Sequence, residues 1–140
     1  MKQIPVIFWT GTGNTQMMAD AVAEAINAAG AEAVVKNVSE ISADEVAGYD
    51  ALALGCPAMG AEVLEECEFE PFFTELEGKL AGKKVALFGS YGWGGSYMQD
   101  WEARVKDAGA TLVADGVLAL GAPDDEAMAK LAEAGKLLAE

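Results

Sequence analysis

Short apolar runs recur along the chain and alternate with longer stretches in which apolar and polar positions are mixed. The run at 51–55 (ALALG) has no polar side chain, as is typical of parallel strands that are buried on both faces. The runs predict five strands, at residues 4–9, 33–38, 51–55, 83–88 and 111–120. Gly116 suggests a bulge or a break in the last of these strands.

Between the predicted strands, apolar side chains return at the period of a helix face. The stretch after the first strand shows this with Met18, Val22 and Ile26. The predicted helices span residues 14–29, 69–80, 97–108 and 124–139. Gly30 and Gly109 stand where a helix-ending glycine is expected.

The alternation of strands and helices predicts a fold class. It favours one α/β domain over residues 1–140, with a five-stranded parallel sheet and helices on both faces. A chain of 140 residues suits a single domain of the commonest size. In open sheets of this kind, ligands bind beyond the carboxyl ends of the strands. The loops after the first, third and fourth strands are therefore the places to look for a site.

The chain is strongly acidic, with 23 Asp and Glu against 9 Lys and Arg, and it has no His. A net charge of −14 repels nucleic acid and would attract basic proteins, although acidity that serves solubility alone is an equally open explanation. Without His, and with Cys56 and Cys67 outside any CxxC pattern, we expect no metal site and two reduced thiols. No apolar run approaches the roughly 18 residues of a membrane span. The amino terminus has no cleavable leader pattern, so we expect a cytoplasmic protein.

The loop after the first strand, TGTGNT at residues 10–15, has the composition of a phosphate-binding loop. Its glycines let backbone amides approach a ligand, and the following helix offers its positive end. The candidate donors are Thr10, Gly11, Thr12, Gly13, Asn14 and Thr15. An ordinary turn with a helix cap is the alternative. The loop lacks the Lys of NTPase loops, and Gln16 stands where a dinucleotide loop has its third glycine, so a lone terminal phosphate fits best.

The other two loops carry side chains that suit a planar ligand. In residues 57–62, Met59 is polarizable and Gly60 allows its peptide to turn over, although a plain turn with Met59 in the core explains this loop alone. In residues 89–97, four glycines surround Trp93, which is unusual for a packed core segment and typical of an indole that meets a ligand or partner. Most of the five Glu of residues 62–70 are expected on a solvated helix face.

Together, the stretches WTGTGNT, LGCPAMGAEVLEECEFEPFF and GKKVALFGSYGWG resemble the flavodoxins, and specifically the short-chain type of anaerobic bacteria. The resemblance implies a flavodoxin-like three-layer sandwich with strand order 2-1-3-4-5 and one non-covalently bound FMN. It also implies that residues 10–15 wrap the FMN phosphate with help from Ser90. The implied function is a low-potential one-electron carrier that shuttles electrons between redox proteins.

The resemblance further implies which residues surround the isoalloxazine ring. Met59 and Trp93 would sandwich the ring, the Gly60 carbonyl would face flavin N5–H, and Glu62 would face the pyrimidine edge. Backbone contacts are expected from Pro57, Ala58, Tyr91, Gly92, Gly94 and Gly95.

The protein is not expected to turn over a substrate, and no residue needs a catalytic role. A small FMN-dependent reductase is the alternative function, but the sequence supplies no nicotinamide site and no second domain. A receiver-type signalling domain is disfavoured, because Gly55 and Cys56 stand where its acidic phosphoacceptor belongs. The expected partners are redox proteins with basic docking surfaces, and we expect the carrier to be a monomer.

Overall fold

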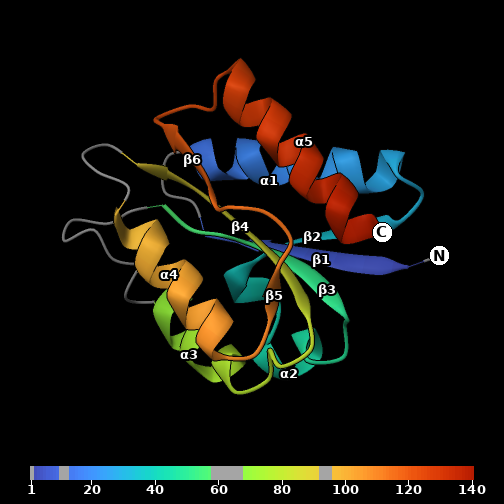
Figure 1. Cartoon of the computed structure of the whole chain (residues 1–140), viewed down its shortest axis with the longest axis vertical. Helices are drawn as coiled ribbons and strands as arrows, with labels where there is room; N and C mark the ends of the chain where they lie inside the picture. The colour runs from blue at the N-terminus through green and yellow to red at the C-terminus, as the bar shows by residue number, and fades with distance from the viewer. Residues whose placement is uncertain (1, 10–12, 58–67, 92–95) are drawn as a thin grey trace.

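A parallel β-sheet forms the centre of the molecule (Figure 1). The computed structural model describes residues 2–9, 13–57, 68–91 and 96–140. Within these residues the strands are β1 (Gln3–Phe8), β2 (Glu32–Asn37), β3 (Ala51–Gly55), β4 (Lys84–Tyr91), β5 (Thr111–Leu112) and β6 (Val117–Leu120). Their order is β2-β1-β3-β4-β5, with β6 also paired to β4, which confirms the predicted order.

Helices cover both faces of this sheet, as predicted (Figure 1). They are α1 (Asn14–Ala28), α2 (Ala43–Val46), α3 (Phe69–Glu77), α4 (Ser96–Asp107) and α5 (Asp125–Ala139), with a 3-10 turn η1 (Val38–Glu40). Gly30 and Gly109 have φ values of 95° and 88°, which confirms that they follow helix ends in the left-handed conformation. The two short elements α2 and η1 were not predicted from the sequence, although Ser42 caps α2 and Asn37 caps η1.

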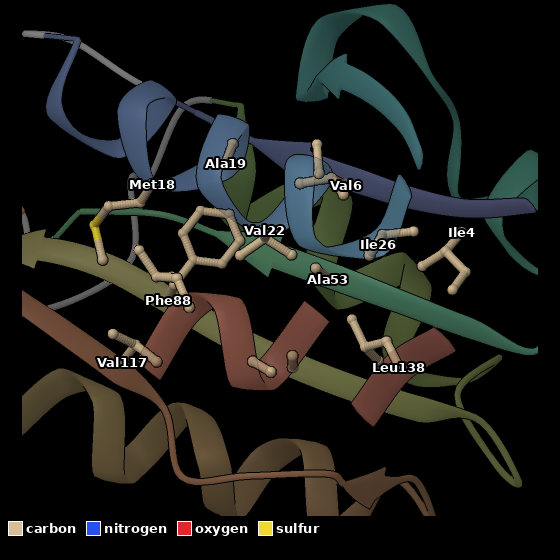
Figure 2. Packing of buried hydrophobic residues seen from close by; sticks show 14 of the residues in the cluster. Ile4, Val6, Met18, Ala19, Val22, Ile26, Ala53, Phe88, Val117 and Leu138 are labelled. Carbon is tan, nitrogen blue, oxygen red and sulfur yellow. The ribbon is translucent and has the colours of Figure 1, made fainter. Parts of the chain in front are cut away.

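The two faces of the sheet carry separate hydrophobic cores, because alternate side chains of each strand point to opposite sides. Ala51 and Ala53 of β3 pack with α1 and α5, whereas Leu52 and Leu54 pack with α2, α3 and α4. Figure 2 shows the first core, in which Val22 and Ile26 of α1 lie above the sheet and near Ala53.

The last predicted strand, at residues 111–120, proved to be two strands. β5 ends at Leu112, and β6 begins at Val117 and continues beside β4. The break includes Gly116, the glycine at which it was expected. The Gly116 amide does not pair with a strand but donates a hydrogen bond of 2.7 Å to the Glu102 carboxylate. A Cβ atom at residue 116 would also overlap the side chain of Met98. A helix side chain thus redirects the chain between the two strands.

The fourth strand extends further than predicted. β4 ends at Tyr91, because Gly89, Ser90 and Tyr91 pair in register with β6. These three residues, which the sequence analysis placed in the loop after the strand, therefore belong to the sheet. Smaller shifts occur elsewhere: Val38 lies in η1 rather than in a strand, and α3 ends at Glu77.

Candidate functional site

The carboxyl ends of three neighbouring strands meet at one edge of the sheet. Gly55 of β3 pairs with Phe8 of β1 on one side and with Phe88 of β4 on the other. The three loops singled out in the sequence therefore start from adjacent strands, as an open α/β sheet requires for a binding crevice.

The predicted site residues divide into two groups. The structure describes Gly13, Asn14, Thr15, Pro57, Ser90 and Tyr91. The others lie outside the described residues: Thr10, Gly11, Thr12, Ala58, Met59, Gly60, Glu62, Gly92, Trp93, Gly94 and Gly95.

The amino end of α1 has the features of an anion site. Gly13 is the N-cap residue, with φ of 92°, and it supplies no side-chain hydrogen bond to the helix. No acidic side chain stands in the first turn, so the positive end of the helix is not neutralised there. The Thr15 side chain is only 1% exposed although it is polar. This set of backbone amides and a buried hydroxyl fits a phosphate group.

Ser90 is held at the end of β4 by the chain that follows β6. Its hydroxyl donates a hydrogen bond of 2.7 Å to the Gly121 carbonyl, and the Gly121 amide donates to the Tyr91 carbonyl at 3.0 Å. The Ser90 hydroxyl oxygen can still accept a hydrogen bond. To donate to a phosphate, however, Ser90 would have to release Gly121.

The end of β3 contacts a residue that the sequence analysis did not single out. The hydroxyl of Tyr97, in the first turn of α4, donates a hydrogen bond of 2.7 Å to the Cys56 carbonyl. Both residues are buried. Periodicity marked Tyr97 only as the start of a helix, and no sequence signal connects it to a residue 41 positions away.

Two of the five glutamates in residues 62–70 are described, and both have partners. Glu68 accepts a hydrogen bond of 3.2 Å from Trp9 Nε1, next to the end of β1. Glu70 accepts from Arg104 at 2.6 Å, and this guanidinium holds the pKa of the Glu70 carboxyl below its usual range. Arg104 also pairs with Glu77 at 2.8 Å, so one guanidinium is shared between two carboxylates.

Two further classes of site were sought in the described part of the chain. No group of three or more His, Cys, Asp and Glu side chains there is arranged to bind a metal ion. In the same residues, every helix is too short or too polar to cross a bilayer.

Comparison with known proteins decides the family. A family model described as flavodoxin matches residues 6–135. The flavodoxin of Clostridium beijerinckii is 47% identical over 135 residues, which cover 96% of this chain and 97% of that protein. The flavodoxin of Megasphaera elsdenii is 47% identical over 116 residues, covering 82% and 85%. The chain belongs to the flavodoxin family.

Structural similarity agrees with this membership. The solution structure of two-electron reduced Megasphaera elsdenii flavodoxin superposes with a TM-score of 0.90 and 44% identity, over 97% of this chain and 98% of that one. The protein is an FMN-binding electron carrier, as the sequence resemblance predicted. FMN supplies the redox chemistry in such a carrier, and the protein supplies binding, orientation and electrostatics.

Proposed function

We propose that the carboxyl edge of the sheet holds FMN, with the phosphate at α1 and the ring between the loops after β3 and β4. The observation that supports this most is the amino end of α1, where a buried hydroxyl accompanies a helix end without acidic residues. Phosphate contacts are assigned to Thr10, Gly11, Thr12, Gly13, Asn14 and Thr15, and to Ser90, whose hydroxyl would exchange the Gly121 carbonyl for a phosphate oxygen. Ring and ribityl contacts are assigned to Pro57, Ala58, Met59, Gly60, Glu62, Tyr91, Gly92, Trp93, Gly94 and Gly95.

Thr15→Val tests the phosphate end of this assignment. The change keeps the shape of the side chain and removes its hydroxyl, so we expect FMN to bind roughly tenfold more weakly. Riboflavin, which lacks the phosphate, should bind as it does to the wild type. Titration of the apoprotein by flavin fluorescence measures both affinities.

Thr111→Val is the matched control, because Thr111 is exposed at the start of β5, at the opposite edge of the sheet. It should leave both affinities unchanged. An equal loss of FMN and riboflavin binding in Thr15→Val would contradict a phosphate role for this hydroxyl.

We further propose that the protein works as a low-potential one-electron carrier without substrate turnover of its own. A net charge of −14 supports this, because negative surroundings disfavour adding negative charge to a bound group. Spectroelectrochemical titration should give two separate one-electron potentials. Steady turnover with NAD(P)H in the absence of any partner protein would instead indicate a reductase.

The net negative charge also supports docking to redox proteins with basic surfaces. We propose as well that the carrier is a monomer, which presents one docking face. Electron transfer to a basic partner should then slow as NaCl is raised, because salt screens the attraction between unlike charges. Stopped-flow measurements over a salt series test this, and light scattering tests the monomer. A rate that does not change with salt would contradict electrostatic docking. A cytoplasmic location stays a prediction that cell fractionation would check.

A further inference from the structure

A helix side chain completes the hydrogen bonding at the end of β3. The Cys56 amide donates to the Phe88 carbonyl at 3.1 Å, as a strand residue would. The Cys56 carbonyl, however, accepts from the Tyr97 hydroxyl at 2.7 Å. Cys56 is 0% exposed and Tyr97 is 2% exposed, so water does not compete for this bond. A buried carbonyl that loses a donor is destabilised, so Tyr97 contributes to holding the Cys56 carbonyl in place.

Gly89 leaves the space that this contact occupies. A Cβ atom at residue 89 would overlap both the hydroxyl oxygen of Tyr97 and the carbonyl oxygen of Cys56. The hydroxyl therefore reaches β3 over a point of β4 where there is no side chain. Three separate segments meet here. Cys56 after β3 provides the acceptor, Tyr97 of α4 provides the donor, and Gly89 of β4 leaves room for their contact.

The donor itself is rigidly placed. The Tyr97 ring is stacked on Trp101, with 6.4 Å between ring centroids and 25° between planes. Burial raises the pKa of the Tyr97 hydroxyl, and the neighbouring Cys56 adds to the rise. The hydroxyl therefore remains a protonated donor at any pH at which the protein works.

Tyr97 is linked to the ends of both loops that are assigned to the flavin ring. Its hydroxyl binds the residue from which residues 57–62 leave β3, and its own main chain follows residues 92–95 at the start of α4. A shift of this side chain would change the starting point of one loop and the end point of the other.

We propose that Tyr97 is a positioning residue for the flavin ring, acting through the Cys56 carbonyl. This inference rests on the proposed assignment of both loops to the ring. Without the hydroxyl, the Cys56 carbonyl loses this donor at the point where β3 leads into residues 57–62, although the Cys56 amide still pairs with Phe88. Ring binding and the reduction potentials then change, whereas phosphate binding at α1 does not.

Tyr97→Phe tests the inference, since it removes the hydroxyl and keeps the stacked ring. FMN and riboflavin should both bind more weakly and by the same factor, on the order of tenfold. The separation between the two one-electron potentials should change. Hydrogen exchange of the FMN-bound protein should accelerate in peptides that contain residues 56–62.

Tyr49→Phe is the matched control, because Tyr49 is a half-buried tyrosine just before β3, at the other end of the strand. It should change none of these quantities. Gly89→Ala approaches the same contact from β4 and should act in the direction of Tyr97→Phe. Because its Cβ would also displace the Cys56 carbonyl oxygen directly, Gly89→Ala corroborates Tyr97→Phe and does not replace it.

The outcomes separate the two proposals. A wild-type protein that binds FMN and riboflavin equally well would overturn the phosphate site and leave the Tyr97 inference standing. If Tyr97→Phe keeps the wild-type affinity for riboflavin, the wild-type reduction potentials and the wild-type hydrogen exchange in residues 56–62, the Tyr97 inference alone is overturned. A lowered unfolding temperature with those three readouts unchanged would mean a purely structural hydroxyl, which also overturns it.

Discussion

The helices on the two faces of the sheet bury different kinds of side chain, although Phe8 and Phe88 of the strands pack with α1 and α5. The face of α1 and α5 is called the aliphatic face, and that of α3 and α4 the aromatic face. The helices α1 and α5 bury aliphatic and small residues, among them Val22 and Ala134. The helices α3 and α4 bury rings, including Phe73 and Trp101. Small residues let two helices approach closely, whereas rings fill the wider space between helix and sheet.

The difference also matters for the binding edge. The aliphatic face brings the amino end of α1 to the edge, with backbone amides and a threonine hydroxyl. The aromatic face brings Tyr97, whose hydroxyl reaches the end of β3. In our proposals, the first face provides the helix end that binds the phosphate, and the second provides the buried tyrosine that positions the flavin ring. Substitutions on each face can test how far this division holds.

Removing a ring from the aromatic face should have the largest effect. Trp101 is 1% exposed and packs edge-on against Phe69 and Phe73, at centroid distances of 5.4 and 5.9 Å. Trp101→Ala should lower the free energy of unfolding by about 3–5 kcal/mol, because a large cavity is left. Denaturant titration followed by circular dichroism measures the loss.

Met128→Ala is the control on the other face, since Met128 of α5 is 41% exposed. Its effect should stay within about 0.5 kcal/mol. If Trp101→Ala lowers the free energy of unfolding by no more than Met128→Ala does, the cluster of rings contributes little to the stability of the protein.

Adding a methyl group to the aliphatic face should have the next largest effect. A Cβ atom at Gly135 of α5 would lie 2.7 Å from the Val22 carbonyl oxygen and 2.8 Å from the Ala25 Cβ atom. Gly135→Ala should destabilise the protein by about 1 kcal/mol, because the overlap outweighs the gain in helix propensity. Thermal unfolding measures the change.

Gly78→Ala is the matched substitution, because a Cβ atom at residue 78 would have no neighbouring atom within 4 Å outside the adjacent chain. It should be neutral or slightly stabilising. Equal effects of the two exchanges would show that the contact between α1 and α5 is not closely packed.

The ion pairs of Arg104 should have the smallest effect. Arg104 joins α4 to α3 through Glu70 at 2.6 Å and Glu77 at 2.8 Å, and its guanidinium lies 4.7 Å from the centroid of Phe73. The paired side chains are 31–34% exposed. Because solvent screens them, Arg104→Met should cost about 1 kcal/mol or less at pH 7.

This cost should depend on pH. Arg104 lowers the pKa of Glu70 in the folded state, so the pair contributes fully above the unfolded glutamate pKa of about 4.3. The contribution is lost as the pH falls through the lower folded pKa. The difference in unfolding free energy between wild type and Arg104→Met should therefore shrink in acid.

Denaturant titrations over a pH series measure this difference. Lys130→Met is the control, because it breaks only an exposed pair with Glu126 on α5. It should differ little from the wild type at any pH. A difference for Arg104→Met that stays constant into acid would contradict the coupling to Glu70.

The amino-acid sequence determined the elements and the candidate site in outline. Periodicity located β3 and the start of α1 to the residue, because apolar spacing and glycine are local signals. Three loops of unusual composition, each after a strand, indicated a site for a phosphate and a planar group. Their resemblance to the flavodoxins implied FMN, and the family comparison confirmed this cofactor. The short α2 was missed because an apolar period cannot be recognised in four residues, although the capping serine was present.

Only the tertiary structure decided how distant residues act together. It divided the last predicted strand, because Glu102 of α4 binds the Gly116 amide. It also drew Gly89 and Ser90 into β4 through pairing with β6. Above all, it placed the Tyr97 hydroxyl on the Cys56 carbonyl, a contact that needs α4 to be packed against the sheet beside Gly89. Local patterns report which side chains a segment buries, but a hydrogen bond between segments exists only once their packing has set the distance between donor and acceptor.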